Sequence, residues 1–200
     1  MRYGVFGGTF DPPHIGHLIL AAESLSQLEL DEILWVLTPE PPHKTGRVIT
    51  NLNIRLEMIH AAIIDNTKFK LSKVDIVRPP PHYAADSLEI LRDLMPGGNF
   101  TYLLGGDSLE ELPTWHDPQR FIDLCDHLGV MCRPGMKLDL ELLEIHLTGV
   151  KEKVKILEAP QLEISSTEIK SRIRSGKSYR YYLPPGVYAI IKSRGLYSVG

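Results

Sequence analysis

The stretch GGTFDPPHIGH, residues 7–17, carries the strongest structural signal in this chain. It follows a short apolar run at residues 3–6, which is typical of a buried strand, and leads into a helical pattern at residues 15–28. A glycine-rich turn between a strand and a helix lets backbone N–H groups approach an anion, and the helix start adds partial positive charge. His14 and His17 share one face of the first helical turn. The stretch therefore predicts chemistry on a phosphate group.

Strand-like and helix-like segments alternate along the rest of the chain. Apolar runs predict further strands at residues 33–37, 70–77, 100–104, 128–132 and 154–157. Helical spacing predicts helices at residues 52–64, 84–95, 118–124, 138–147, 165–175 and 185–194. This alternation predicts an α/β fold with a doubly wound, mostly parallel sheet and helices on both faces. Ligands in such folds bind outside the carboxyl ends of the strands, so two glycine turns, at residues 7–8 and 105–108, are expected to face one cleft.

Length and composition predict one soluble domain spanning residues 1–200, with a helical C-terminal subregion at about residues 160–200. The chain has 200 residues, of which 43% are hydrophobic and 24% charged, and its net charge of −3 gives no electrostatic case for a nucleic-acid partner. No apolar run approaches the roughly 20 residues that span a bilayer, and no signal-peptide pattern is present. A disulfide between Cys125 and Cys132 is possible on count, but free buried thiols in a cytoplasmic protein are the favoured interpretation.

Two loop segments carry residues suited to a nucleotide. The proline-rich stretch at residues 39–44 ends in Lys44, whose ammonium can reach a phosphate, although a solvated surface loop is the favoured interpretation of the stretch in isolation. Residues 105–108 follow a strand, and Asp107 can hold ribose hydroxyls there, or Asp107 or Ser108 can cap a helix. Trp115 can stack on a flat ring or pack in the core.

The stretch ISSTEIK, residues 164–170, predicts both a helix start and an anion site. Ser165 with Glu168 fits a capping box. Further hydroxyls at Ser166 and Thr167, together with the Lys170 ammonium, suit a phosphate at the same helix start.

These motifs resemble a known family. Residues 7–17 resemble the (H/T)xGH signature of the nucleotidyltransferases, which transfer AMP or CMP from a nucleoside triphosphate. The four stretches in this order, with Arg55 and Met58, residues 132–135 and residues 183–187, resemble the bacterial nicotinate mononucleotide adenylyltransferases over nearly the whole chain. The resemblance implies a Rossmann-like nucleotidyltransferase fold and transfer of AMP from ATP to nicotinate mononucleotide. It also implies Mg²⁺ that enters with ATP rather than sitting in a protein cage.

The resemblance implies roles for individual residues. The residues expected to be catalytic are His14, His17 and Lys44. The residues expected to bind ATP are Gly7, Gly8, Thr9, Phe10, His14, His17, Ser165, Ser166, Thr167 and Lys170. The residues expected to bind the acceptor are Lys44, Tyr83, Ala84, Gly106, Asp107, Trp115 and Arg133.

The chain departs from the family pattern at two positions. Ala84 stands where the family has a hydroxyl, so contact with the pyridine carboxylate would rest on backbone N–H groups. Lys170 stands where the family has arginine, which keeps the charge but loses the bidentate fork. The alternatives are another superfamily member, such as a pantetheine-phosphate adenylyltransferase or a cytidylyltransferase, and a nucleotide-binding sensor without catalysis. The sequence leaves a monomer and a homo-oligomer equally open.

Overall fold

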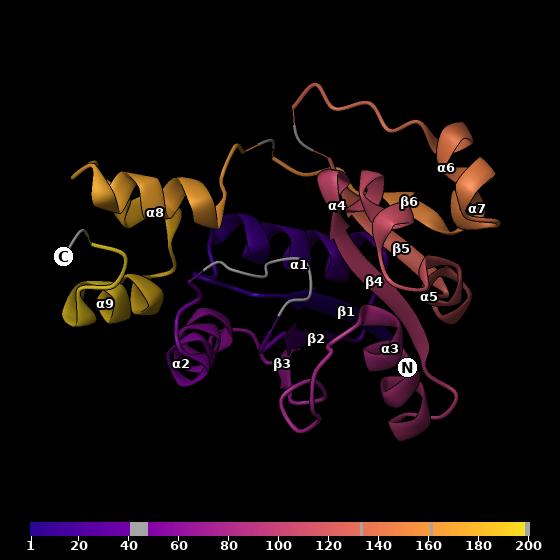
Figure 1. Cartoon of the computed structure of the whole chain (residues 1–200), viewed down its shortest axis with the longest axis horizontal. Helices are drawn as coiled ribbons and strands as arrows, with labels where there is room; N and C mark the ends of the chain where they lie inside the picture. The colour runs from indigo at the N-terminus through magenta and orange to yellow at the C-terminus, as the bar shows by residue number, and fades with distance from the viewer. Residues whose placement is uncertain (41–47, 133, 161, 199–200) are drawn as a thin grey trace.

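The computed structural model describes residues 1–40, 48–132, 134–160 and 162–198 and contains one parallel sheet in this part of the chain (Figure 1). The strand order is β3-β2-β1-β4-β5-β6, and every neighbouring pair is parallel. This confirms the predicted doubly wound α/β fold. The strands are β1 (Arg2–Gly8), β2 (Glu32–Leu37), β3 (Phe69–Ser72), β4 (Asn99–Gly105), β5 (His127–Met131) and β6 (Val154–Ile156).

Both faces of the sheet are covered. In β2, Ile33, Trp35 and Leu37 enter the core beneath α1 (Ile15–Gln27) and α2 (Leu52–Ile63). The alternate residues Leu34 and Val36 enter the opposite core, because successive side chains of a strand point to opposite faces. Helices that contribute to that second core include α3 (Ala84–Leu94), α5 (Pro118–Leu124), α6 (Leu140–His146) and α7 (Val150–Lys153).

The C-terminal helices α8 (Ser166–Arg174) and α9 (Pro185–Arg194) lie next to α2, at the end of the molecule away from α5, α6 and α7 (Figure 1). A third apolar cluster joins them to α2 through Met58, Ile169, Val187 and Ile191. A Cβ at Gly186 would lie 2.9 Å from the Cβ of Ala61, so glycine is needed for this approach of α9 to α2. None of the helices in the described residues is long and apolar enough to cross a membrane.

Most predicted elements are confirmed to within two residues, but two predictions are wrong. The strand predicted at residues 70–77 ends at Ser72. Beyond Ser72 the chain turns, and the carbonyl of Lys73 accepts from the N–H groups of Ile76 and Val77. The side chain of Asp75 in this turn is buried and forms an ion pair with Arg78, which a sheet strand would not allow. The glycine turn predicted at residues 105–108 is the helix α4 (Gly106–Glu110), which begins directly after β4.

The strand order places the functional segments together. β1 and β4 are neighbours at the centre of the sheet, and the chain leaves them toward opposite ends of it. Their carboxyl ends, the motif after β1 and α4 after β4, therefore meet at the point where the strand order reverses.

Candidate active site

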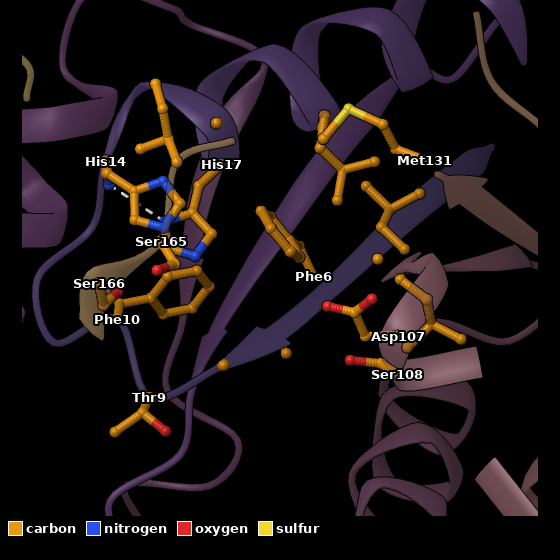
Figure 2. Close-up of a pocket in the computed structure, with 18 of the residues that line it drawn as sticks. Phe6, Thr9, Phe10, His14, His17, Asp107, Ser108, Met131, Ser165 and Ser166 are labelled. Carbon is orange, nitrogen blue, oxygen red and sulfur yellow. Dashed lines mark hydrogen bonds between the residues drawn. The ribbon is translucent and has the colours of Figure 1, made fainter. Parts of the chain in front are cut away.

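A cavity of about 500 Å³ opens at the carboxyl ends of β1 and β4 (Figure 2). His14, Ser165 and Ser166 lie on one side of Phe6, and Asp107 and Ser108 lie on the other, so the cavity has two halves. It brings together the predicted site residues Gly7, Gly8, Thr9, Phe10, His14, His17, Gly106, Asp107, Trp115, Ser165, Ser166, Thr167 and Lys170.

Four predicted site residues lie elsewhere or are not described. Lys44 and Arg133 lie outside the described residues. Tyr83 and Ala84 do not line the cavity; they form the start of α3, where the Tyr83 ring stacks on His116 at a centroid distance of 3.9 Å.

The two histidines of the motif are arranged by the start of α1. His14 is the N-cap residue, and its backbone N–H donates to Nδ1 of His17 at 3.0 Å. Because Nδ1 accepts this bond, a neutral His17 carries its proton on Nε2. The two rings stack at a centroid distance of 3.6 Å, and the edge of the His17 ring meets Phe10 at 5.1 Å. His17 is thereby held as a donor at Nε2.

Close packing behind the motif requires glycine at position 7. A Cβ there would lie 2.1 Å from the hydroxyl oxygen of Tyr102 on β4, which is deeply buried. Phe10 follows with a positive φ of 45° and is only 3% exposed. The motif is therefore a tightly packed turn whose shape depends on β4.

The start of α8 is fastened to the motif. The Ser165 hydroxyl accepts from the backbone N–H of Glu168 at 3.1 Å, which confirms the predicted helix cap. The Ser166 hydroxyl, expected to face a phosphate, donates to the carbonyl of Pro12 at 2.8 Å. Ser166 thus joins two segments 154 positions apart in the sequence, and only its acceptor capacity is left for ligand chemistry.

Asp11 is a site residue that sequence reasoning missed. Its side chain is 6% exposed, and it pairs with the ammonium of Lys170 while accepting from the Tyr197 hydroxyl at 2.6 Å. Burial raises the pKa of Asp11, but hydrogen bonds from Lys170, Thr50 and Tyr197 outweigh burial and lower the pKa below its usual value. The acidic residue within the motif is therefore ionised and neutralises Lys170.

Arg55, which the resemblance included without a role, supports the site from behind the cavity lining. It is 2% exposed, and its guanidinium donates to the carbonyls of Thr9 at 3.0 Å, Thr38 at 2.9 Å, Pro39 at 2.7 Å and Thr50 at 2.8 Å. Burial lowers its pKa, which the charge of Asp11 opposes. One residue of α2 thus connects the motif to both sides of the segment between β2 and α2. In the sequence, this role could have been suspected from the position of Arg55, a charged residue among the apolar residues of the predicted helix at residues 52–64.

The other half of the cavity is built by α4 and the residues after it. Gly105 is the N-cap of α4, so the expectation that Asp107 or Ser108 caps this helix is wrong. Asp107 lies in the first turn, on the cavity wall (Figure 2). Trp115 is half-buried, packs against Phe121 at a centroid distance of 5.3 Å and also lines the cavity. Its stacking on a ligand ring remains a prediction.

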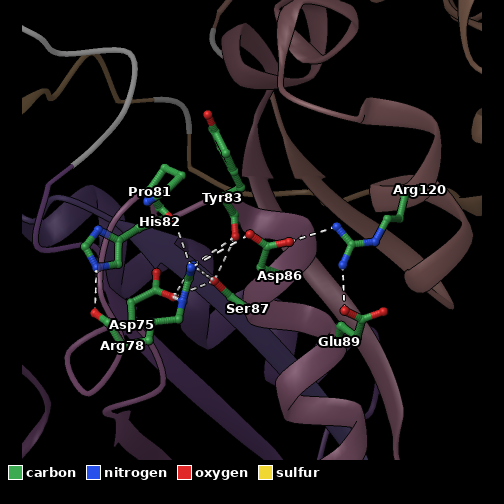
Figure 3. A network of polar contacts seen from close by, with 9 residues as sticks. All are labelled: Asp75, Arg78, Pro81, His82, Tyr83, Asp86, Ser87, Glu89 and Arg120. Atoms are coloured by element: carbon green, nitrogen blue, oxygen red, sulfur yellow. Dashed lines mark hydrogen bonds and ion pairs between the residues drawn. The ribbon is translucent and has the colours of Figure 1, made fainter.

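A polar network lies behind the start of α3 (Figure 3). The Arg78 guanidinium pairs with Asp75 at 2.9 Å and donates to the carbonyls of Pro81 at 2.7 Å and Tyr83 at 3.2 Å. The Ser87 hydroxyl donates to the same carboxylate of Asp75 at 2.6 Å. These bonds fix the backbone that leads into α3.

Two acidic residues of α3, Asp86 and Glu89, share an arginine partner. In the first turn, Asp86 accepts from Arg120 at 2.8 Å, and the same guanidinium donates to Glu89 at 2.6 Å (Figure 3). A positive charge near a helix start is unfavourable, but Arg120 is paired with the Asp86 carboxylate there, so the two charges offset each other.

Comparison with known proteins gives one consistent result. The model of the cytidylyltransferase-like family matches residues 5–172. A protein of Thermomicrobium roseum named "Probable nicotinate-nucleotide adenylyltransferase" is 40% identical, over 98% of this chain and 91% of its own length. A protein of the same name from Geobacillus kaustophilus is 36% identical, over 98% and 86%. The fold is similar to Plasmodium falciparum nicotinic acid mononucleotide adenylyltransferase complexed with NaAD, with a TM-score of 0.80 at 21% identity, covering 98% of this chain and 97% of that one.

Proposed function

The chain belongs to the cytidylyltransferase-like family and, within it, to the nicotinate-nucleotide adenylyltransferases, and we propose that the two halves of its cavity bind ATP and nicotinate mononucleotide side by side. The enzyme transfers the adenylyl group of ATP to nicotinate mononucleotide, which yields deamido-NAD and pyrophosphate in NAD biosynthesis. The observation that carries the assignment of the two halves is that one cavity joins the histidine motif and the start of α8 to Asp107 and Trp115.

The reaction forms one bond and breaks one. A 5′-phosphate oxygen of the mononucleotide attacks the α-phosphorus of ATP, and the bond from that phosphorus to the bridging oxygen of the β-phosphate breaks. The attacking phosphate is already an anion near neutral pH, so no strong general base is required. Catalysis then consists of alignment and stabilisation of charge.

We assign the phosphate-binding roles to the motif side of the cavity. His14 and His17 donate to the phosphates, and the N-terminus of α1 adds its partial positive charge. Gly7, Gly8, Thr9 and Phe10 form the turn around the triphosphate, and the Ser165–Thr167 start of α8 with Lys170 closes it. The role of Lys44 remains a prediction of the sequence.

The acceptor lies on the side of α4 in this proposal. Asp107 holds a ribose and Trp115 stacks on the pyridine ring, with Gly106 beside them. In this proposal the pyridine carboxylate extends beyond the cavity lining toward the start of α3, where the first N–H groups of Ala84 and its neighbours have no intrahelical acceptor. A helix start favours a negative charge, and Arg120 offsets the repulsion from Asp86. The role of Arg133 in binding the acceptor remains a prediction of the sequence.

Mg²⁺ enters this site as the complex with ATP. Magnesium binds through substrate phosphates and one or two carboxylates, and it keeps several waters. The described residues contain no group of three or more His, Cys, Asp or Glu side chains that could hold a metal, so the triphosphate supplies most of its ligands in our proposal. We place the enzyme in the cytoplasm, which agrees with Cys125 and Cys132 being free.

Release of pyrophosphate tests the proposal directly. We expect the protein with ATP and Mg²⁺ to release pyrophosphate with nicotinate mononucleotide, more slowly with nicotinamide mononucleotide, and not with phosphopantetheine. An excess of EDTA should abolish the reaction, because the triphosphate then loses its metal. Release with phosphopantetheine but with neither pyridine nucleotide would identify another branch of the superfamily. No release with any acceptor would indicate a sensor.

The Arg120→Met variant tests the location of the pyridine carboxylate. It removes the 2.8 Å partner of Asp86 and leaves only the longer ion pair with Arg78 at 3.8 Å, so the less compensated charge in the first turn of α3 should repel a carboxylate. We expect the KM for nicotinate mononucleotide to rise about two- to fivefold, with the KM values for ATP and nicotinamide mononucleotide unchanged. Arg92→Met is the control, because Arg92 pairs with Asp126 at the other end of the same helix. An equal rise for both mononucleotides would contradict this location.

A further inference from the structure

Three segments that are far apart in the sequence meet at Asp11. Asp11 lies in the motif after β1, Lys170 lies on α8, and Tyr197 follows α9, so the partners are 159 and 186 positions away. No sequence motif includes Tyr197. The contact between this tyrosine and the catalytic motif therefore exists only in the folded chain.

Tyr197 contacts the ionic pair twice. Its hydroxyl donates to Oδ1 of Asp11 at 2.6 Å, while Lys170 and the backbone N–H of Thr50 are on Oδ2. Its ring also lies beneath the Lys170 ammonium, with the nitrogen 4.9 Å from the ring centroid. Burial and the charge of Asp11 raise the pKa of Tyr197, so the hydroxyl keeps its proton and remains a donor.

This arrangement restricts where the lysine ammonium can be. Lysine has a flexible four-carbon stem and three N–H donors, and it does not form the rigid fork of an arginine. In this chain the side chain of Lys170 is 19% exposed on the cavity wall, and Asp11 and the Tyr197 ring hold it from two sides. Asp11 uses part of the donor capacity, so the ammonium can bind a phosphate without leaving its partner.

We propose that Tyr197 is a positioning residue for ATP: it orients Asp11, and Asp11 holds the Lys170 ammonium where the triphosphate binds. This inference rests on the proposed function, specifically on the role of Lys170 as a ligand of the triphosphate. In this arrangement the surrounding residues supply the rigidity that the lysine side chain lacks.

The Tyr197→Phe variant removes the hydroxyl and keeps the ring. We expect the KM for ATP to rise about 3- to 10-fold, because the carboxylate that fixes Lys170 loses a charge-assisted hydrogen bond. The kcat and the KM for nicotinate mononucleotide should stay within twofold of the native values. Tyr181→Phe is the matched control, since the Tyr181 side chain is 82% exposed, and it should change none of the three constants. An unchanged KM for ATP in Tyr197→Phe overturns the inference.

A double-mutant cycle with Lys170→Met separates positioning from a general structural effect. If Tyr197 acts through Lys170, the Tyr197→Phe change should have little further effect on the KM for ATP in the Lys170→Met background. An equally large rise in that background overturns the inference, because the tyrosine then acts through the fold. If Lys170→Met itself leaves the KM for ATP unchanged, the proposed role of Lys170 fails and the inference fails with it. A rise in Lys170→Met without a rise in Tyr197→Phe overturns the inference alone. Melting temperatures of all variants show whether each remains folded.

Discussion

Replacing His17 by asparagine should lower kcat by about 10²–10³-fold while leaving the thermal stability close to that of the native enzyme. Asparagine places an acceptor oxygen near the position of Nδ1, so it can still accept from the backbone N–H of His14. It has no atom at the position of Nε2, the nitrogen that bears the proton in the native site. Steady-state rates of pyrophosphate release and a melting curve measure the two effects separately.

Two further substitutions control this experiment. His17→Gln restores an N–H donor near the position of Nε2 but not the acceptor at Nδ1, so it should recover part of the rate and lose part of the stability. His60→Ala should change neither quantity, because His60 is exposed on α2. Near-native turnover in His17→Asn would show that Nε2 takes no part in the reaction.

Replacing Arg55 by methionine should cost at least about 3 kcal/mol of unfolding free energy. The variant keeps an apolar stem of similar length but leaves the buried carbonyl of Thr9 and the partly buried carbonyls of Thr38, Pro39 and Thr50 without their donor. A domain of this size is stable by only about 5–15 kcal/mol, so the loss is a large share of the total. Urea denaturation followed by circular dichroism measures it.

Arg194→Met is the matched control for Arg55. Arg194 pairs with Glu57 at 2.6 Å, but both side chains are 46% exposed, and exposed ion pairs contribute only about 0–1 kcal/mol. A loss below about 1 kcal/mol in Arg55→Met, equal to that of the control, would show that water replaces the guanidinium without penalty. The hydrogen bonds by which Arg55 connects the motif to the segment before α2 would then contribute little to stability.

The fold could be predicted from local patterns wherever those patterns were long and periodic. The apolar run at residues 33–37 predicted β2, and the helical pattern that begins at Pro118 predicted α5. The alternation of strands and helices was enough to predict the parallel sheet. The prediction failed at residues 73–77, where apolar residues suggested a strand. Asp75 is bound there by Arg78 and Ser87, and a local pattern carries no information about such a pair.

The candidate site was predictable as a set of motifs but not as a network. The motifs at residues 7–17 and 164–170 were recognised separately, and the structure puts both on one cavity. Asp11 and Tyr197 were missed because their significance comes from contacts across more than 150 positions. Arg55 was recognised as part of a resemblance, but its four carbonyl partners belong to three separate stretches of backbone.

The hydrogen bond from Ser166 to Pro12 also has a consequence for biosynthesis. A ribosome adds roughly 5–20 residues each second, so about 8–30 s separate the synthesis of the motif from that of the start of α8. During this interval the nascent chain can pair β1 with β2 and β4 but lacks one wall of its nucleotide cavity. The motif at residues 7–17 is thus completed only after the start of α8 has been made, and ATP can stabilise this cavity only from that point of synthesis onward.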